Sequence, residues 1–456
     1  MHSCDLGRDQ AEFSRTHIPP PRQIAKAVAV NYGPAIDAGF FTCFVRITGT
    51  EPAVMFERAP FKQCPNCREM GLGILSAGGD FLTRRCKSCR HTTTEPLPFV
   101  NKAVVYLDQF AVSEIFKTRS GTRRKDANSG EFWSVASEKL NTVLLLQQAV
   151  FPSGSVHTEE SLVFASGGDL RLAHDLLGGD IDFISVEEIE SRQAWAFFRS
   201  FVDGLPPPSL EFDVDRILHG ERNGWLRDMH ISVNTDYSHF AAKTRASRDA
   251  GGESLASLFR AWADEKPAFK AVLRRELDAY GRAKFQAASD AFRQVAAADE
   301  GEDMASYLDG VLNPHLREFF ELREFLVRRG LAEEEAGAKV LEFWMWQGND
   351  HQPYHRTSCY LFAALARKAA SGQQRPPSRG TLNDIKAIAA YGPYVDAMFL
   401  DREWAGLLAE KPLNEDLPIK ARIFSMSTQG AFLAYLDDLI AQADTQVRAY
   451  AREIYG

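Results

Sequence analysis

The stretch that most constrains the fold of this chain is AVVYLDQ, residues 103–109. Its apolar run leads directly into Asp108, and a helical pattern follows. An uninterrupted apolar run of this length predicts a strand buried on both faces, as in a parallel sheet covered by helices. Ligands of such sheets bind at the carboxyl ends of the strands, so Asp108 is a candidate site residue. The alternative is that Asp108 only caps the following helix.

A second strand late in the chain repeats this arrangement. Residues 395–400 (VDAMFL) predict a strand, and Asp401 follows it before a helix expected over 402–408. Another helix, which begins near Asp384, precedes this strand. If the two strands share one parallel sheet, Asp108 and Asp401 lie at the same edge.

Four of the seven cysteines form two CxxC pairs, Cys64/Cys67 and Cys86/Cys89, with 18 residues between the pairs. This spacing predicts a zinc ribbon in which four thiolates close a structural Zn²⁺ site. The ribbon is also rich in cations: Lys62, Arg68, Arg84, Arg85, Lys87 and Arg90. These cations indicate a nucleic-acid contact, a solvated basic face or a platform that docks on the rest of the chain.

The strand motifs, together with Phe151-Pro152 and the segment HTEE (157–160), resemble those of PIN-like nuclease domains. Matched position by position, the resemblance implies metal-binding acids at Asp108, Glu160, Asp384 and Asp401. Asp396 matches an acid of the Pro-Tyr-x-Asp variant and either supplements or replaces Asp384. Glu159, beside Glu160, leaves the second acid ambiguous.

The resemblance implies an endonuclease in which carboxylates hold Mg²⁺ or Mn²⁺, hard cations that prefer oxygen ligands. RNA is the favoured substrate, and a toxin or defence role is an analogy with the family. The ribbon and the helical insertion are expected to recognise the substrate or a protein partner. Two alternatives remain: a DNA nuclease with the same site, and an inactive PIN-like scaffold whose ribbon binds nucleic acid or a protein partner.

Cations near the expected site are candidates for phosphate contacts. They are Arg119, Arg123, Arg124 and Lys125 in the loop after the first helix, and Arg402 after Asp401.

The 456 residues predict several domains, and a net charge of −8 argues against a global basic surface for nucleic acid. The expected fold class is α/β, a PIN-like (Rossmann-like) parallel sheet with a large helical insertion and a small N-terminal zinc ribbon. The expected domains are an arm (1–38), the ribbon and its flanking strands (39–98), the first part of the sheet domain (99–165), the helical insertion (166–375), and the second part of the sheet domain with C-terminal helices (376–456). The two strands that flank the ribbon are expected over 39–58. The start lacks the features of a signal peptide, and no apolar run approaches the roughly 18 residues of a membrane span, so a cytoplasmic location is expected.

Overall fold

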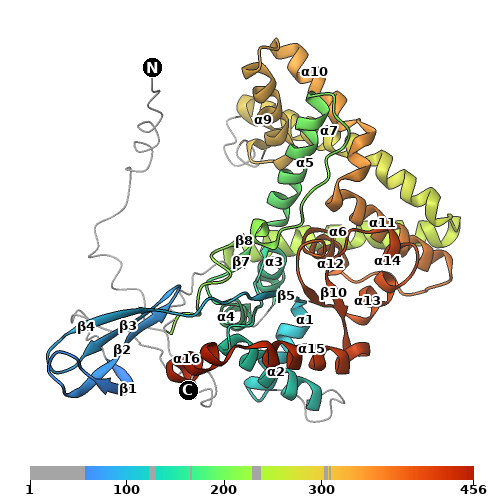
Figure 1. The fold of residues 1–456 in the computed structure, drawn as a ribbon. Helices are drawn as coiled ribbons and strands as arrows, with labels where there is room; N and C mark the ends of the chain where they lie inside the picture. Colours follow the sequence, from blue (N-terminus) through green and yellow to red (C-terminus); the bar gives the residue numbers. More distant parts are fainter. Residues whose placement is uncertain (1–56, 123–129, 165–166, 229–237, 302–306, 308–309) are drawn as a thin grey trace, which may run out of the picture. The chain divides into compact units, whose positions relative to one another are not determined.

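The computed structural model describes residues 57–456, apart from 123–129, 165–166, 229–237, 302–306 and 308–309 (Figure 1). The expected N-terminal arm and nearly all of the two strands expected over 39–58 lie outside the described residues. The rest is a mixed α/β structure with a parallel sheet and many helices, as the sequence predicted at this coarser level.

The parallel sheet has four strands in the order β10-β9-β5-β6, and each neighbouring pair is parallel. The strands are β5 (Ala103–Leu107), β6 (Ala149–Val150), β9 (Ala397–Phe399) and β10 (Arg422–Phe424). The two central strands, β5 and β9, are those that carry an acid beyond their carboxyl ends. Residues almost 300 positions apart in the sequence are therefore neighbours in the sheet.

Alternate residues of β5 enter two different hydrophobic cores. Val104 and Tyr106 belong to one core, whereas Val105 and Leu107 belong to the other. Because successive strand residues point to opposite faces, a strand covered on both sides must be apolar at every position. This explains the continuous apolar run in the sequence.

Helices from distant parts of the chain cover the two faces of the sheet (Figure 1). One face packs against α1 (Gln109–Arg119), α2 (Gly130–Leu145), α4 (Gly167–Gly178) and α15 (Gln429–Gln442). The other packs against α3 (Ser155–Val163), α5 (Val186–Val202), α6 (Ser238–Glu265), α11 (Pro353–Ala370), α12 (Thr381–Tyr391), α13 (Arg402–Ala409) and α14 (Leu413–Asp416).

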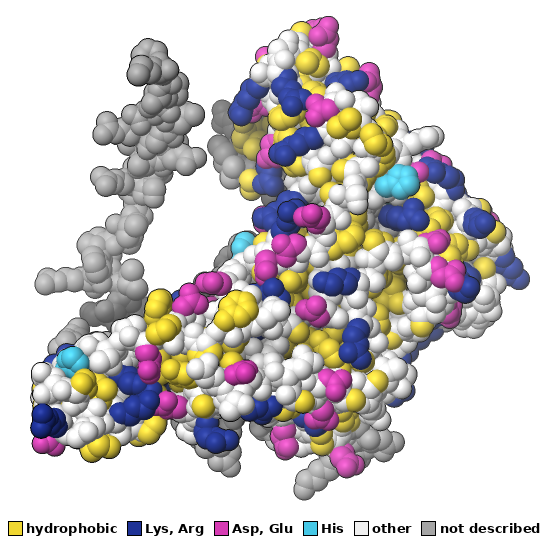
Figure 2. Space-filling model, viewed as in Figure 1, with side chains coloured by type: hydrophobic (Ala, Val, Ile, Leu, Met, Phe, Trp, Pro, Cys, Tyr) yellow, Lys and Arg dark blue, Asp and Glu magenta, His cyan; other side chains and the backbone are white. Residues whose placement is uncertain are grey.

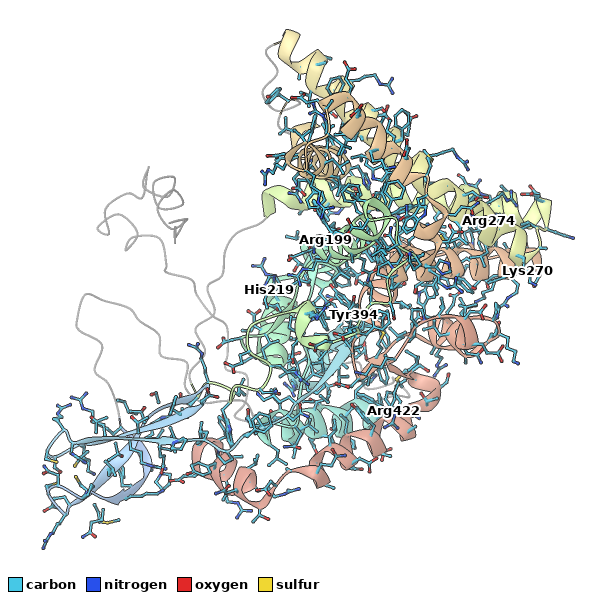
Figure 3. All side chains as sticks on the ribbon, turned by 45° about the horizontal axis from the view of Figure 1, so that its top comes forward. Arg199, His219, Lys270, Arg274, Tyr394 and Arg422 are labelled. Carbon is cyan, nitrogen blue, oxygen red and sulfur yellow. The ribbon has the colours of Figure 1, made fainter. Side chains whose placement is uncertain are left out.

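Apart from α4, which packs on the first face of the sheet, most of the helical segment expected over 166–375 belongs to two cores. Helices α6 and α11 share the core of the sheet, and the hydroxyl of Tyr394 accepts a hydrogen bond from Gln193 of α5 at 3.2 Å (Figure 3). A separate core joins the later part of α5 to α7 (Phe269–Gly301), α9 (Pro314–Arg328) and α10 (Glu333–Trp344). The shorter elements of this segment are β7 (Asp182–Phe183), β8 (Leu218–His219), η2 (Val214–Ile217) and η3 (Gln347–His351).

The cysteine-rich segment forms an antiparallel sheet in the order β1-β2-β3-β4. Its strands are β1 (Arg58–Gln63), β2 (Met70–Gly78), β3 (Phe81–Cys86) and β4 (Thr92–Pro96). A small hydrophobic core joins this sheet to the C-terminal helix α16 (Thr445–Tyr455), where Ile74 and Leu82 are in one cluster with Val447 and Ile454. A short η4 (Met426–Thr428) precedes α15.

Candidate functional site

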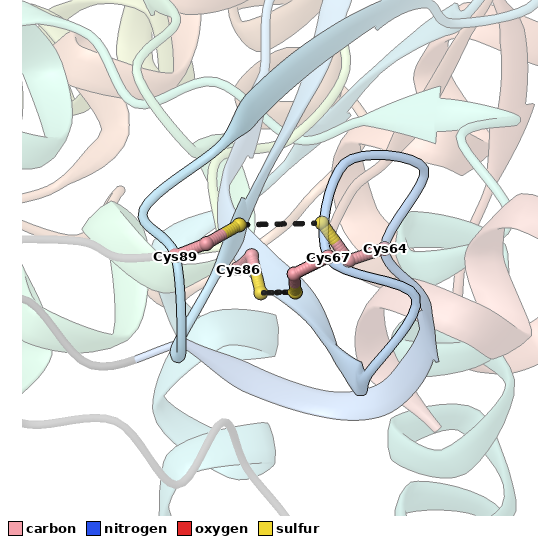
Figure 4. Close-up of side chains that lie close together, drawn as sticks. All are labelled: Cys64, Cys67, Cys86 and Cys89. Carbon is pink, nitrogen blue, oxygen red and sulfur yellow. Dashed lines mark hydrogen bonds between the residues drawn. The ribbon is translucent and has the colours of Figure 1, made fainter.

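Two turns of the ribbon bring its four cysteines together (Figure 4). The Sγ atoms of Cys64 and Cys89 lie 3.6 Å apart. Those of Cys67 and Cys86 lie 3.7 Å apart, and all four lie within 4.8 Å of one another. Four sulfurs that bind one zinc tetrahedrally at 2.3 Å stand about 3.8 Å apart. The quartet could therefore hold a metal ion such as zinc.

The two CxxC turns have the same backbone geometry. The amide of Arg68 donates to the carbonyl of Cys64 at 2.8 Å, and the amide of Arg90 donates to that of Cys86 at 3.0 Å. Both arginines have a positive φ, 64° and 62°. A hydrogen bond from the side-chain amide of Asn66 is the largest influence that lowers the pKa of Cys89, to about 6. A low thiol pKa favours the thiolate, the form that binds metal ions.

Several ribbon cations are paired with acids. Arg84 is buried and forms ion pairs with Glu95 of β4 and Glu453 of α16. Lys62 also reaches Glu453, at 3.0 Å. Figure 2 shows basic and acidic side chains adjoining over the ribbon. Of the interpretations left open by the sequence, these contacts support docking on the rest of the chain, through α16.

Asp108 directly follows β5, and its backbone amide donates to the carbonyl of Phe399 in β9 at 3.0 Å. It occupies the N-cap position of α1, but its side chain makes no capping hydrogen bond. An aspartate at this position normally contributes to stability by capping. Asp108 thus differs from Asp401, whose side chain does make a capping hydrogen bond.

Asp401 lies two residues beyond β9, at the same edge of the sheet as Asp108, because β5 and β9 are parallel neighbours. Its Oδ1 accepts a capping hydrogen bond from the amide of Trp404 at 2.8 Å. The indole Nε1 of Trp404 in turn donates to Oδ2 of Asp384, in the first turn of α12, at 2.9 Å. One buried tryptophan thus connects two of the predicted acids.

Glu160 reaches this edge from α3. Its side chain is buried, and Oε1 accepts a hydrogen bond from Asn383, the residue before Asp384, at 3.4 Å. Hydrogen bonds thus hold one oxygen each of Glu160, Asp384 and Asp401. Donors that orient carboxylates in this way are typical of the surroundings of metal ligands.

The four acids influence one another electrostatically. The pKa of Asp108 is raised well above its usual range by burial first, and then by the charges of Asp384, Glu160 and Asp401. The pKa of Asp384 is raised to about 7, again by burial first and also by Glu160 and Asp401. Burial raises the pKa of Glu160 and of Asp401 as well. Perturbed pKa values of this kind cluster at functional sites.

The acids stand further apart than the thiols. Over the residues that the structure describes, the cysteine quartet is the only group of three or more His, Cys, Asp or Glu side chains whose ligand atoms all lie within 4.8 Å. Ionised carboxylates repel one another without a cation between them.

The structure places the alternative acids of the sequence prediction differently. Asp396 lies before β9, where its Oδ2 accepts a hydrogen bond from the amide of Val104 at 2.9 Å. Val104 is four residues before Asp108, about 13 Å along a strand. Placing Asp396 with the site acids was therefore wrong, because it lies at the opposite end of the sheet. On α3, Glu160 and not Glu159 is the acid whose charge raises the pKa of Asp108.

The predicted phosphate-binding cations have different surroundings. Arg119 donates to the Oγ of Ser137 in α2 at 2.7 Å and to its carbonyl at 3.2 Å, so this guanidinium braces two helices. Arg402 is exposed beside Asp401. The remaining three, Arg123, Arg124 and Lys125, lie outside the described residues.

A buried histidine pair, which the sequence reasoning did not single out as a pair, anchors the residues on both sides of Asp108. The amide at the N-terminus of α3 donates to Nδ1 of His157, so the ring proton is on Nε2, which donates to the carbonyl of Leu107 at 2.9 Å. His174 donates through Nε2 to the side chain of Gln109, also at 2.9 Å. Burial lowers the pKa of His157 to about 4, so this anchor is uncharged at neutral pH.

Arg248 of α6 is the other residue that sequence reasoning missed. Its Nη2 lies 4.0 Å from Oε1 of Glu160. No motif marks this arginine, because only the packing of α6 against α3 and α12 brings it to the edge. A cavity of about 210 Å³ is lined by Asp401 and Trp404 together with Arg375 and Thr381.

Comparisons with protein-family models, with curated proteins and with solved structures found no match. Among the helices that the structure describes, none has both the length and the apolar character that a membrane crossing requires.

Proposed function

We propose that this chain is a metal-dependent endonuclease of the PIN-like kind, with RNA as its favoured substrate. The observation that carries the proposal is the hydrogen-bonded placement of Glu160, Asp384 and Asp401 beyond the carboxyl ends of the central strands, where burial and the charges of these three acids raise the pKa of Asp108. Ligands of open parallel sheets bind at this edge. The resemblance noted in the sequence assigns metal binding to the same four residues.

The four carboxylates supply oxygen ligands of the type that Mg²⁺ and Mn²⁺ prefer. When bound, such a cation lowers the pKa of a water molecule and stabilises charge on the phosphate. The protein's own part is to hold the acids in place. Trp404 fixes Asp384 relative to Asp401. His157 holds the backbone carbonyl of Leu107, and His174 holds the side chain of Gln109, on the two sides of Asp108.

The ribbon is proposed to hold one structural zinc ion. All four candidate ligands are thiols, so no ligand position remains open for a substrate. The ion pairs with Glu453 and the shared core with α16 give the ribbon a role in stabilising the C-terminal helix.

Cleavage of end-labelled single-stranded RNA and DNA with Mn²⁺, Mg²⁺ or no divalent cation tests the proposal. We expect metal-dependent cutting of RNA that Asp108→Asn abolishes, because this variant removes a charged ligand with little change in shape. Asp396→Asn is the matched control and should cut like the wild type, because it lies at the other end of the sheet.

Failure of the wild type to bind Mn²⁺ in a calorimetric titration, with zinc still present in stoichiometric amount, would favour the scaffold alternative. Cutting of DNA in preference to RNA would keep the site and change the substrate. Equal loss of activity in Asp108→Asn and Asp396→Asn would refute the assignment of the site to the carboxyl edge.

A further inference from the structure

We infer that Arg248 binds a phosphate group of the nucleic-acid substrate beside Glu160. The inference rests on the proposed function and adds a residue from the helical segment to the site. Arg248 lies on α6, which packs against α3 and α12, the helices that carry Glu160 and Asp384. Its guanidinium is close to the carboxylate of Glu160.

The guanidinium of Arg248 makes only long contacts with the residues that the structure describes. The side chain is 26% exposed, and its Nη2 is 4.0 Å from Glu160, at the limit of an ion pair. Within the described residues, its guanidinium also makes a long hydrogen bond, 3.4 Å from Nε to the carbonyl of Arg379. A guanidinium has five N–H donors in a planar fork. Phosphate oxygens match this fork in paired hydrogen bonds.

The segment beside α6 that contains Arg379 and Gly380 does not cover the guanidinium of Arg248. Arg379 pairs with Asp249 of α6 at 2.8 Å, which ties the segment to the helix beside Arg248. The next residue, Gly380, lacks a side chain, and a Cβ there would lie 3.5 Å from both Nη2 of Arg248 and Oε1 of Glu160. A side chain at this position would begin in van der Waals contact with both groups.

The charges of the site also favour an anion at Arg248. When ionised, the four acids carry four negative charges, which two divalent cations would balance. Glu160 then no longer compensates the positive charge of Arg248. The single negative charge of a phosphodiester would compensate the charge of Arg248. A phosphate at this position would lie next to a proposed metal ligand, Glu160.

Binding of a fluorescein-labelled single-stranded RNA to the full chain, in Ca²⁺ and from 50 to 200 mM salt, tests the inference. Fluorescence anisotropy should show that Arg248→Gln binds about tenfold or more weakly, since hydrogen bonds to charged groups are the strong ones. The slope of log affinity against log salt should fall by about 0.7, the value for one phosphate contact of a single strand. Arg248→Lys should recover part of the affinity.

Arg274→Gln is the matched control for the loss of one positive charge. Arg274 lies on α7 and is already committed to Asp278 and to Asp350, the latter at 2.7 Å (Figure 3). This variant should keep the wild-type affinity and salt slope. Mn²⁺ binding is titrated in each variant without RNA.

The inference is wrong if Arg248→Gln keeps the wild-type salt slope and affinity. It is also wrong if this variant loses Mn²⁺ binding together with RNA binding, because Arg248 would then support Glu160 and not the substrate. Failure of the wild type itself to bind Mn²⁺ would instead refute the proposed function.

Discussion

Replacing Asp384 by asparagine should flatten the pH dependence of stability of the protein without divalent cations. The carboxyl of Asp384 has a pKa of about 7 in the folded chain, against 3.8 as its ordinary value. The folded state therefore holds this proton more tightly than the unfolded state does. Stability is highest when the carboxyl is protonated and falls as pH rises towards and through 7.

The size of the effect follows from the same two values. Between pH 5.5 and pH 8 the unfolded carboxyl is already ionised, whereas the folded one loses its proton. With 1.36 kcal/mol per pKa unit, this costs the wild type about 2 kcal/mol of unfolding free energy over the interval. Asp384→Asn removes this cost. It also removes a negative charge beside Asp108, which further reduces the loss of stability with rising pH.

Urea unfolding at the two pH values measures the difference. Divalent cations should be removed by dialysis against resin-treated buffer and not with a strong chelator, because a chelator would also remove the zinc ion proposed for the cysteine site. Buried histidines such as His157 contribute equally to both proteins and cancel in the comparison. An equal change of stability with pH in the wild type and in Asp384→Asn would refute the reasoning. Saturating Mg²⁺ at pH 8 should stabilise the wild type and not the variant.

Three further predictions test the other parts of the site. Glu160→Gln should abolish metal-dependent cleavage while Glu159→Gln retains it, and equal activity of the two variants would contradict the choice of Glu160. Trp404→Phe removes the hydrogen bond to Asp384 and should weaken Mn²⁺ binding about tenfold or more in a titration at pH 7; unchanged affinity would mean that the indole does not orient this acid. Cys86→Ser should lower the zinc content, measured by a colorimetric chelator, and expose the ribbon to proteolysis. If the variant keeps its zinc and its ribbon remains resistant to proteolysis, the four cysteines are not the metal site.

The sequence identified the parts of the fold that have a strong local pattern. The apolar run before Asp108 has no polar position because both faces of β5 are covered. The CxxC spacing likewise led to four thiols that lie together. In each case, burial on both faces or the spacing of the thiols determines the residue types at consecutive or regularly spaced positions.

The errors and omissions concern positions that depend on register and on distant packing. Asp396 was expected inside a strand over 395–400, but β9 begins at Ala397, which leaves Asp396 at the amino end. Arg248 belongs to an ordinary amphipathic helix, and nothing local distinguishes it from other arginines of the segment. Its place beside Glu160 follows only from how α6 packs on α3.

The pairing of β5 with β9 has a consequence for the timing of synthesis. Asp108 and Asp401 are 293 residues apart in the chain, although their strands are neighbours. A ribosome that adds about 5–20 residues per second needs roughly 15 to 60 s to travel that distance. Throughout this interval β5 lacks its central partner, and the acidic edge has no Asp384 or Asp401. The complete set of acids can therefore form only after the segment that carries Asp384 and Asp401 has been synthesised.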